Sequence, residues 1–182
     1  ISNQNLISDE RGKIFLSKFN PENQLIWAKS LGEQANVHAH SIHFIENKLY
    51  ISGSFQDEIS FNNGTIKLKG NGLSTVFIAQ MNLDGSVNWA KTTISNNSAC
   101  KSYLQSDNFG NIIIASNYSE KVQNDRSENK REEKKGFYFK AFSQEGNLLR
   151  EGTFKGSSEI VLNCFSVDKM GNLLFAGLFS KE

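Results

Sequence analysis

Short apolar runs alternate with turn-forming residues along the chain, and one pattern of run, turn and run occurs three times. Its copies occupy residues 14–30, 76–92 and 137–153, and successive copies begin 62 and 61 residues apart. In each copy apolar and polar residues alternate over a few positions, which is typical of a half-buried β-strand. No stretch shows the apolar stripe of an amphipathic helix, so strands are expected throughout.

A second pattern fills the intervals between these copies. Residues 40–55, 101–118 and 163–179 again read as strand, turn and strand, and each ends in a β-branched and aromatic run such as "LYISGSF". Such runs indicate strands that are buried on both faces. Each unit of about 61 residues therefore carries four short strands.

The turns between these strands contain residues that tolerate the backbone angles of tight hairpins. Pro21, the only proline, lies in the turn of the first copy, where its fixed φ suits a turn. We predict structural turn roles for Asp84, Gly85, Asp107, Gly110, Gly146, Asp168 and Gly171.

Four-stranded units repeated along a chain predict an all-β fold of the β-propeller type, in which blades stack because one sheet cannot bury both faces alone. Residues 1–182 are expected to form a single propeller segment of about three repeats. An outer half-blade covers 14–31, full blades cover 40–93 and 101–154, and an inner half-blade covers 163–182. Since propellers use about 4–8 blades, the chain is expected to be part of a larger propeller or to close by association with other chains.

Two tryptophans occupy equivalent places in the first pattern. Trp27 and Trp89 each begin a Trp-Ala-Lys triplet after the turn of their copy. An indole at the edge of a blade can lie across the gap to the next blade, so we predict a structural docking role for both, with ligand stacking as the alternative. The third copy has Arg150 at this place, so its contact is expected to differ.

These motifs resemble the seven-bladed β-propeller repeat family of bacterial secreted and surface proteins. The resemblance rests on "SDNFGNIIIASNY" and "VDKMGNLLFAGLF", and on the order of strands around "MNLDGSVNWAKT". The chain departs from the family pattern at "IENK", which lacks the Asp and Gly, and at Arg150. The resemblance implies propeller blades in a secreted, cell-surface or periplasmic bacterial protein, and it supplies no catalytic residues.

Charge and hydropathy exclude some classes of partner. Twenty Lys and Arg against 19 Asp and Glu give a formal net charge of +1, so no overall field draws the chain to nucleic acid or to an anionic membrane. No apolar run approaches the roughly 20 residues needed to span a bilayer. The expected partner is a protein, or the remaining blades of a larger chain, and no cofactor is expected.

The histidines and cysteines are candidates for metal or disulfide chemistry. His38 and His40 would face the same way on one strand, and His43 would point to the other face. No third ligand with zinc spacing accompanies them, so a polar patch is the preferred interpretation. Cys100 and Cys164 lie in strand-like runs and are interpreted as small buried hydrophobic residues, with a disulfide between them as the alternative.

Several turn residues also have side chains of interest. A calcium site is the alternative to turn formation for one oxygen-rich set, but the spacing of a calcium loop is absent. That set comprises Asp107, Asn108, Asn111 and Asp168. Glycosylation sequons occur at Asn63, Asn96 and Asn117, and in a bacterial protein they are interpreted as Asn-rich loops.

Two polar stretches are predicted to leave the second strand of a unit and return to the third. These are residues 56–75 and 119–136, and within the latter, 120–136 hold six basic and five acidic residues. Because this charged segment lacks apolar residues to bury, a solvated or disordered loop is expected. Both stretches should emerge at the same rim of adjacent blades, either as a recognition site or as solvent-exposed connections.

No catalytic motif accompanies this scaffold. Glu33, Asp57 and Glu58 are acids on expected loops, but nothing in the sequence pairs them. The sequence therefore favours a non-catalytic binding or scaffold propeller of the bacterial envelope that contacts a protein or a surface glycan. The alternative is a segment of a glycan hydrolase or lyase whose catalytic residues lie in other blades.

Overall fold

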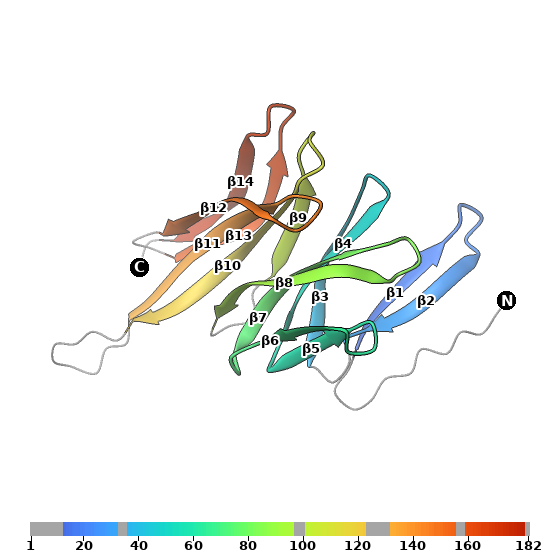
Figure 1. The fold of residues 1–182 in the computed structure, drawn as a ribbon. Helices are drawn as coiled ribbons and strands as arrows, with labels where there is room; N and C mark the ends of the chain where they lie inside the picture. Colours follow the sequence, from blue (N-terminus) through green and yellow to red (C-terminus); the bar gives the residue numbers. More distant parts are fainter. Residues whose placement is uncertain (1–12, 33–35, 97–100, 123–131, 156–158, 181–182) are drawn as a thin grey trace.

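The computed structural model describes residues 13–32, 36–96, 101–122, 132–155 and 159–180. Within these ranges the chain is all-β, as predicted, with 14 strands and no helix (Figure 1). Every strand pairing is antiparallel. The strands are β1 (Ile14–Phe19), β2 (Leu25–Leu31), β3 (Val37–Ile45), β4 (Lys48–Phe55), β5 (Glu58–Phe61), β6 (Ile66–Lys69), β7 (Ser74–Met81), β8 (Val87–Asn96), β9 (Ser102–Ser106), β10 (Ile112–Val122), β11 (Glu132–Phe142), β12 (Leu148–Lys155), β13 (Glu159–Val167) and β14 (Leu173–Ser180).

These strands form two four-stranded sheets and three two-stranded sheets. The first sheet has the order β3-β4-β7-β8, and the second sheet has the order β9-β10-β11-β12. β1 and β2 form the N-terminal pair, β13 and β14 form the C-terminal pair, and β5 and β6 form a separate hairpin between β4 and β7. Figure 1 shows the sheets side by side in a row, with the two pairs at opposite ends. Closure into a propeller stays a prediction.

The repeat of the sequence is also a repeat of strand pairing. The hairpins β1–β2, β7–β8 and β11–β12 are equivalent, and each has a register shift one residue before the end of its first strand. Such a bulge increases the local twist of a strand, so the three hairpins share this twist near the turn, and β7–β8 has a second shift between Val76 and Phe77. The shifts lie between Lys18 and Phe19, between Gln80 and Met81, and between Ala141 and Phe142.

Five hairpin turns share one hydrogen-bonding scheme. The first residue of the turn donates its N–H to the carbonyl four residues on, and the fourth donates back to the first, as in Asp168 N to Asn172 O and Gly171 N to Asp168 O, both 3.0 Å. The fourth residue has a positive φ, which glycine adopts without strain. The turns span 20–24, 82–86, 107–111, 143–147 and 168–172, and their fourth residues are Asn23, Gly85, Gly110, Gly146 and Gly171.

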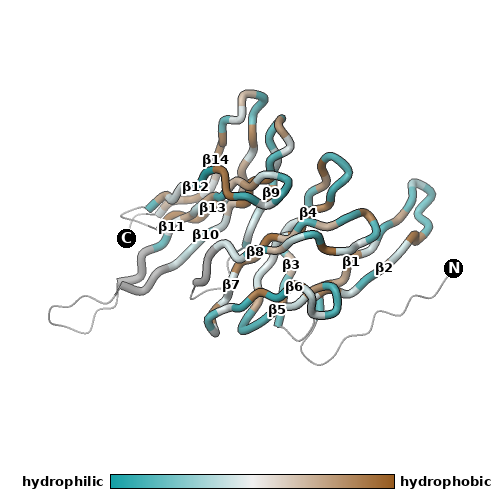
Figure 2. The backbone as a smooth tube through the Cα atoms, viewed as in Figure 1, coloured by the Kyte–Doolittle hydropathy of each residue, from teal (hydrophilic) through white to brown (hydrophobic). Residues whose placement is uncertain are grey.

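In the described part of the chain, the hydrophobic core lies between the sheets and forms three clusters. Neighbouring residues of one strand point to opposite faces, so each four-stranded sheet packs on both sides. In β4, Ile51 packs toward the N-terminal pair and Tyr50 toward the second sheet. In β10, Ile114 packs toward the first sheet and Ile113 toward the C-terminal pair. The turns at the upper ends of the strands are mostly hydrophilic (Figure 2).

Residues 56–75 connect β4 to β7, as expected, but they contain the β5–β6 hairpin rather than a polar loop. Ile59 and Phe61 of β5 are buried in the first core cluster, and the ring of Phe61 lies 5.8 Å from that of Phe77. The sequence did not predict this hairpin because the four residues "EISF" are too short to define a period.

The charged stretch 119–136 connects β10 to β11, as expected, but both of its ends are strands. β10 continues to Val122, β11 begins at Glu132, and these two residues are paired. The expectation of a solvated loop is wrong for these ends, because continuing the ladder satisfies backbone N–H and C=O groups without apolar side chains. Residues 123–131 lie outside the described residues.

Candidate functional site: a polar pocket at the rim

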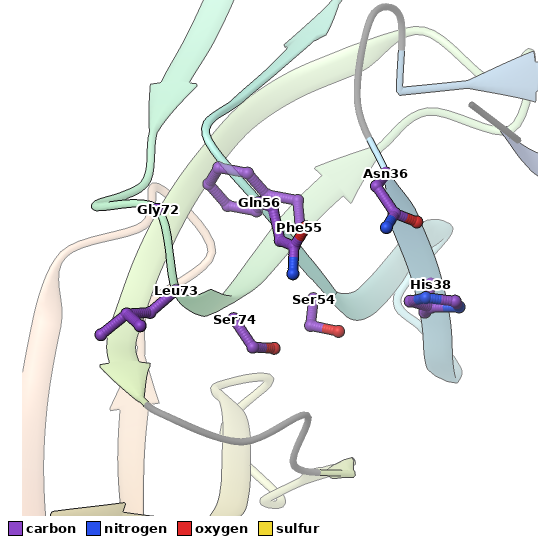
Figure 3. Close-up of a pocket in the computed structure, with 8 residues that line it drawn as sticks. All are labelled: Asn36, His38, Ser54, Phe55, Gln56, Gly72, Leu73 and Ser74. Carbon is purple, nitrogen blue, oxygen red and sulfur yellow. The ribbon is translucent and has the colours of Figure 1, made fainter.

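A polar pocket opens at the end of the first sheet, where β3 begins, β4 ends and β7 begins (Figure 3). Its volume is about 180 Å³. The lining contains two side-chain amides, two hydroxyls and an imidazole, without a carboxylate or an amine, which suits a neutral ligand rich in hydrogen-bonding groups. This rim pocket is lined by Asn36, His38, Ser54, Phe55, Gln56, Gly72, Leu73 and Ser74.

A narrow neck of main chain shapes the rim pocket. The chain leaves β4 and re-enters β7 there: Gln56 N donates to Asn36 O at 3.3 Å, and Gly70 N donates to Asp57 O. Asp57 holds a positive φ of 60°, which turns the chain into the β5–β6 hairpin. Main-chain contacts therefore fix the walls of the pocket.

His40 joins two sheets and does not act as a free partner of His38. A register shift places His40 at a bulge in β3. Its Nδ1 accepts the main-chain N–H of Ser102 in β9 at 3.2 Å, and its Nε2 lies 3.2 Å from Ser54 Oγ. Because Nδ1 accepts, the ring proton resides on Nε2 and is donated to Ser54.

The environment of His40 keeps its ring neutral. Burial is the main cause that lowers its pKa from 6.5 to about 4, and electrostatic interactions with His38 and Lys101 lower it further. The network continues to the first sheet, since Ser102 Oγ donates to Ser52 Oγ at 2.8 Å. His40 is therefore a neutral hydrogen-bonded link between the first and second sheets.

His43 also contacts β9, although the alternation of a regular strand predicted that it would point away from His40. Its Nε2 lies 2.9 Å from Ser106 Oγ, and burial lowers its pKa. The expectation is wrong because the bulge at His40 changes the alternation of β3. Among the described residues, no group of three or more His, Cys, Asp or Glu is placed to hold a metal ion.

The carboxylates considered for calcium are occupied by their own turns. Asp107 Oδ1 accepts the N–H groups of Phe109 and Asn111, both at 2.9 Å. Asp168 Oδ1 makes the equivalent bonds, including one of 2.9 Å from Asn172 N, and hydrogen bonds from Asn172 lower the pKa of Asp168. Both carboxylates are therefore engaged in hydrogen bonds within their own turns.

The three loop acids singled out from the sequence do not form a pair among the described residues. Glu58 lies 3.6 Å from Lys67 across the β5–β6 hairpin, an exposed ion pair worth about 0–1 kcal/mol. Asp57 lies at the neck, and Glu33 is outside the described residues.

Both tryptophans reach the turn of the following unit. Trp27 Nε1 donates to Leu83 O at 3.0 Å, and Trp89 Nε1 donates to Gln144 O at 2.9 Å. The indole of Trp89 is partly buried, with its ring 6.0 Å from that of Tyr50. The contact is thus the same at two successive junctions.

The third junction, between the second sheet and the C-terminal pair, uses other residues. Arg150, at the place of the tryptophans, donates from Nη2 to Gly171 O at 2.9 Å. Asn108 Nδ2 donates to Lys169 O at 2.6 Å, so this considered calcium ligand is also a contact between neighbouring turns. Both bonds end on main-chain carbonyls of the β13–β14 turn.

Two asparagines act as structural bridges that the sequence did not predict. Asn62 bonds both N–H and C=O of Val87, at 3.0 and 2.7 Å, and Asn117 bonds both groups of Leu162, at 2.7 and 2.9 Å. The sequon interpretation of Asn117 had treated it as a loop residue. Asn63 is exposed in the turn before β6, and the side chain of Asn96 lies outside the described residues.

Cys164 is an exposed free thiol on β13, so its interpretation as a buried hydrophobic residue is wrong. The reason is that β13 belongs to a two-stranded pair at the end of the row, where one face lacks a neighbour among the described residues. Cys100 lies outside the described residues.

Two comparisons with known proteins were made. A scan against protein-family models found no match, and a search of curated proteins found none. In the described part of the chain, no helix is long and apolar enough to cross a membrane.

Proposed function

We infer that this chain is a segment of a β-propeller of the bacterial seven-bladed repeat type, and that it binds a partner without chemical turnover. One observation carries the inference: Trp27 bonds Leu83 O just as Trp89 bonds Gln144 O one unit later. Successive junctions built alike are what a ring of equivalent sheets requires. The common strand order of the two four-stranded sheets supports the same architecture.

Binding takes place at the end of the sheets that carries the rim pocket. The β5–β6 hairpin and the extended ends of β10 and β11 leave their sheets at this end (Figure 1). The neutral donors and acceptors of the pocket suit sugar hydroxyls, and Leu73 offers an exposed apolar surface beside them. The favoured partner is therefore a glycan or glycosylated protein of the bacterial envelope, a location that rests on the resemblance of the repeats.

Two features support binding over catalysis by the described residues. His40 has both ring nitrogens in hydrogen bonds to serines, so it has no position from which to exchange a proton with a ligand. The carboxyls of Asp84, Glu145 and Asp168 have lowered pKa values because they accept hydrogen bonds within their own turns. A hydrolase or lyase segment remains the alternative, with no described residue in its favour.

The test is calorimetric binding of envelope polysaccharide fragments to variants of the rim pocket. Gln56→Ala and His38→Ala should each weaken binding by about tenfold, as expected for a lost ligand hydrogen bond. Lys169→Ala, in a turn at the opposite end of the sheets, should bind as wild type does. Unchanged affinity in both rim variants, or release of shortened glycan products, would overturn the proposal.

A further inference from the structure

The two strand pairs at the ends of the row are complementary halves of one four-stranded sheet. The C-terminal pair occupies the places of β3–β4 and β9–β10 in the repeat, and the N-terminal pair occupies the places of β7–β8 and β11–β12. Among the described residues, β14 pairs only with β13, and β1 pairs only with β2. Each pair therefore presents one strand edge with open backbone groups, which invites another strand.

The complete sheets define the register in which these two edges would meet. In the first sheet Gly53 of β4 lies opposite Phe77 of β7. The equivalents of these residues are Gly177 in β14 and Phe15 in β1. A Cβ at Gly53 would clash with the main-chain oxygen of His38 in β3 and lie 2.8 Å from the ring of Phe77, so the glycine makes room for both. Gly177 would make the same room for Phe15.

The exposed aromatic residues of the two end pairs are buried wherever their equivalents have a complete sheet. Phe15 is 68% exposed, whereas Phe77 is 0% exposed. Phe179 of β14 is 82% exposed, whereas its equivalent Phe55 is 1% exposed and lies 6.1 Å from the ring of Phe77. A joined sheet would bring Phe179 to Phe15 in the same arrangement.

An apolar groove of about 330 Å³ lies beside β3, where the first two strands of a complete preceding sheet would stand. It runs between β1 and β3 and includes Leu16, Phe19, Ile42 and Phe44. Ile42 is 54% exposed here, whereas its equivalent Leu104 in β9 is 4% exposed because the first sheet covers it. The groove therefore lacks the cover that a complete neighbouring sheet gives to its equivalent.

We propose that β14 of one copy of this chain pairs with β1 of a second copy, which forms a composite sheet of order β13-β14-β1-β2. The two pairs lie at opposite ends of the row, so the edges of β1 and β14 do not meet within one copy (Figure 1). The register places Leu174 opposite Lys18 and Gly177 opposite Phe15. The exposed Leu174 of β14 fills the groove beside Ile42 of the second copy, as its equivalent Tyr50 covers Leu104 in the complete sheets.

Two copies joined at both edges form a closed ring. The described residues of each copy contribute two full sheets and two halves, so two copies of this 182-residue chain give six four-stranded sheets, within the range of about 4–8 that propellers use. This ring rests on the proposed propeller architecture, whereas the edge pairing rests only on the strand order and the register. A head-to-tail contact that closes is finite, while one that does not close gives an open filament.

A measurement of molecular mass and substitutions on the strand edges test the ring. Sedimentation of the 182-residue chain should give twice its mass of 20.4 kDa. Phe15→Asp and Phe179→Asp should each convert the dimer to a folded monomer, because both side chains are exposed in the single copy. Phe109→Asp, an equally exposed turn residue at neither edge, should leave the dimer intact. A wild-type chain that stays monomeric at high concentration would overturn the proposal.

Cross-linking tests the register separately. With Cys100 and Cys164 replaced by Ser, the pair Lys18→Cys and Leu174→Cys should form a disulfide between copies under mild oxidation. The control pair Lys18→Cys and Leu178→Cys, four residues out of register, should not. Equal cross-linking of both pairs would contradict the register. A ladder of higher oligomers with the correct cross-link would uphold the pairing and overturn the closed ring, and neither result bears on glycan binding at the rim pocket.

Discussion

The side-chain amide of Asn117 in β10 bonds the main chain of Leu162 in β13 as the backbone of a neighbouring strand would. Its Nδ2 donates to Leu162 O at 2.9 Å, and Leu162 N donates to its Oδ1 at 2.7 Å. The bulge after Leu162 interrupts the β13–β14 ladder at this place, so the amide joins the second sheet to the C-terminal pair. Asn62 makes the same kind of bridge to Val87.

Removing the Asn117 bridge should destabilise the protein. Asn117→Ala leaves two main-chain groups of Leu162 without this partner, and the expected loss is about 1–3 kcal/mol. Urea unfolding at pH 7 measures it. Asn163→Ala, the exposed neighbour of Leu162, is the matched control and should change stability by less than about 0.5 kcal/mol. Equal losses in both variants would show that the bridge adds nothing.

The indole of Trp89 should contribute both packing and a hydrogen bond. Trp89→Ala is expected to cost about 3 kcal/mol, the lower end of large-to-small core changes, because the indole is only partly buried. Trp89→Phe keeps a ring but loses the bond to Gln144 O, and should cost about 1 kcal/mol. Chemical denaturation compares them with Ile26→Ala, an exposed position of β2. If Phe costs as much as Ala, the hydrogen bond dominates and the packing argument fails.

Stability should fall as the pH drops from about 6.5 toward 4. The pKa of His40 is about 4 in the folded protein and near 6.5 in the unfolded chain, so the unfolded chain binds the proton more tightly in this window. The stabilisation is fully present above pH 6.5 and is lost toward pH 4, by about 1–2 kcal/mol after allowance for solvent screening.

Denaturation at several pH values in this window measures the effect. His43 shifts in the same direction, so His40→Asn should remove part of the slope and the double variant His40→Asn/His43→Asn most of it. A double variant that keeps the full wild-type slope would assign the pH dependence to other groups.

Two turn glycines separate backbone strain from side-chain crowding. Gly171 and Gly146 both have φ near 82°, but a Cβ at Gly171 meets nothing within 4 Å, whereas one at Gly146 lies 3.0 Å from the indole of Trp89. Gly171→Ala should cost about 1 kcal/mol from backbone strain alone. Thermal unfolding of Gly146→Ala should show a larger loss. A larger loss of stability in Gly171→Ala than in Gly146→Ala would contradict the crowding argument for Gly146.

The sequence was sufficient to predict the repeat and the strands that recur with it, but not the β5–β6 hairpin, because a recurring strand depends on local spacing that returns every 61 or 62 residues. It was insufficient where a bulge at one residue or a contact of one side chain determines the local structure. The bulge at His40 reverses the alternation that placed His43, and nothing in "VHAHSIH" marks it. The bridges of Asn62 and Asn117 join segments far apart in sequence, so only tertiary structure brings them together. The rim pocket likewise depends on three strand ends that meet in space.

The tryptophan contact also bears on how repeat units can be gained or lost during evolution. The acceptor of each indole is a main-chain carbonyl, and the residues that supply it, Leu83 and Gln144, have unrelated side chains. Every residue has such a carbonyl, so a duplicated unit docks on its neighbour as soon as it keeps the indole and the length of the turn. Mutations can then accumulate in the acceptor turn without loss of the joint. The design allows units to be added or removed by gene duplication and deletion while the exposed turns diverge.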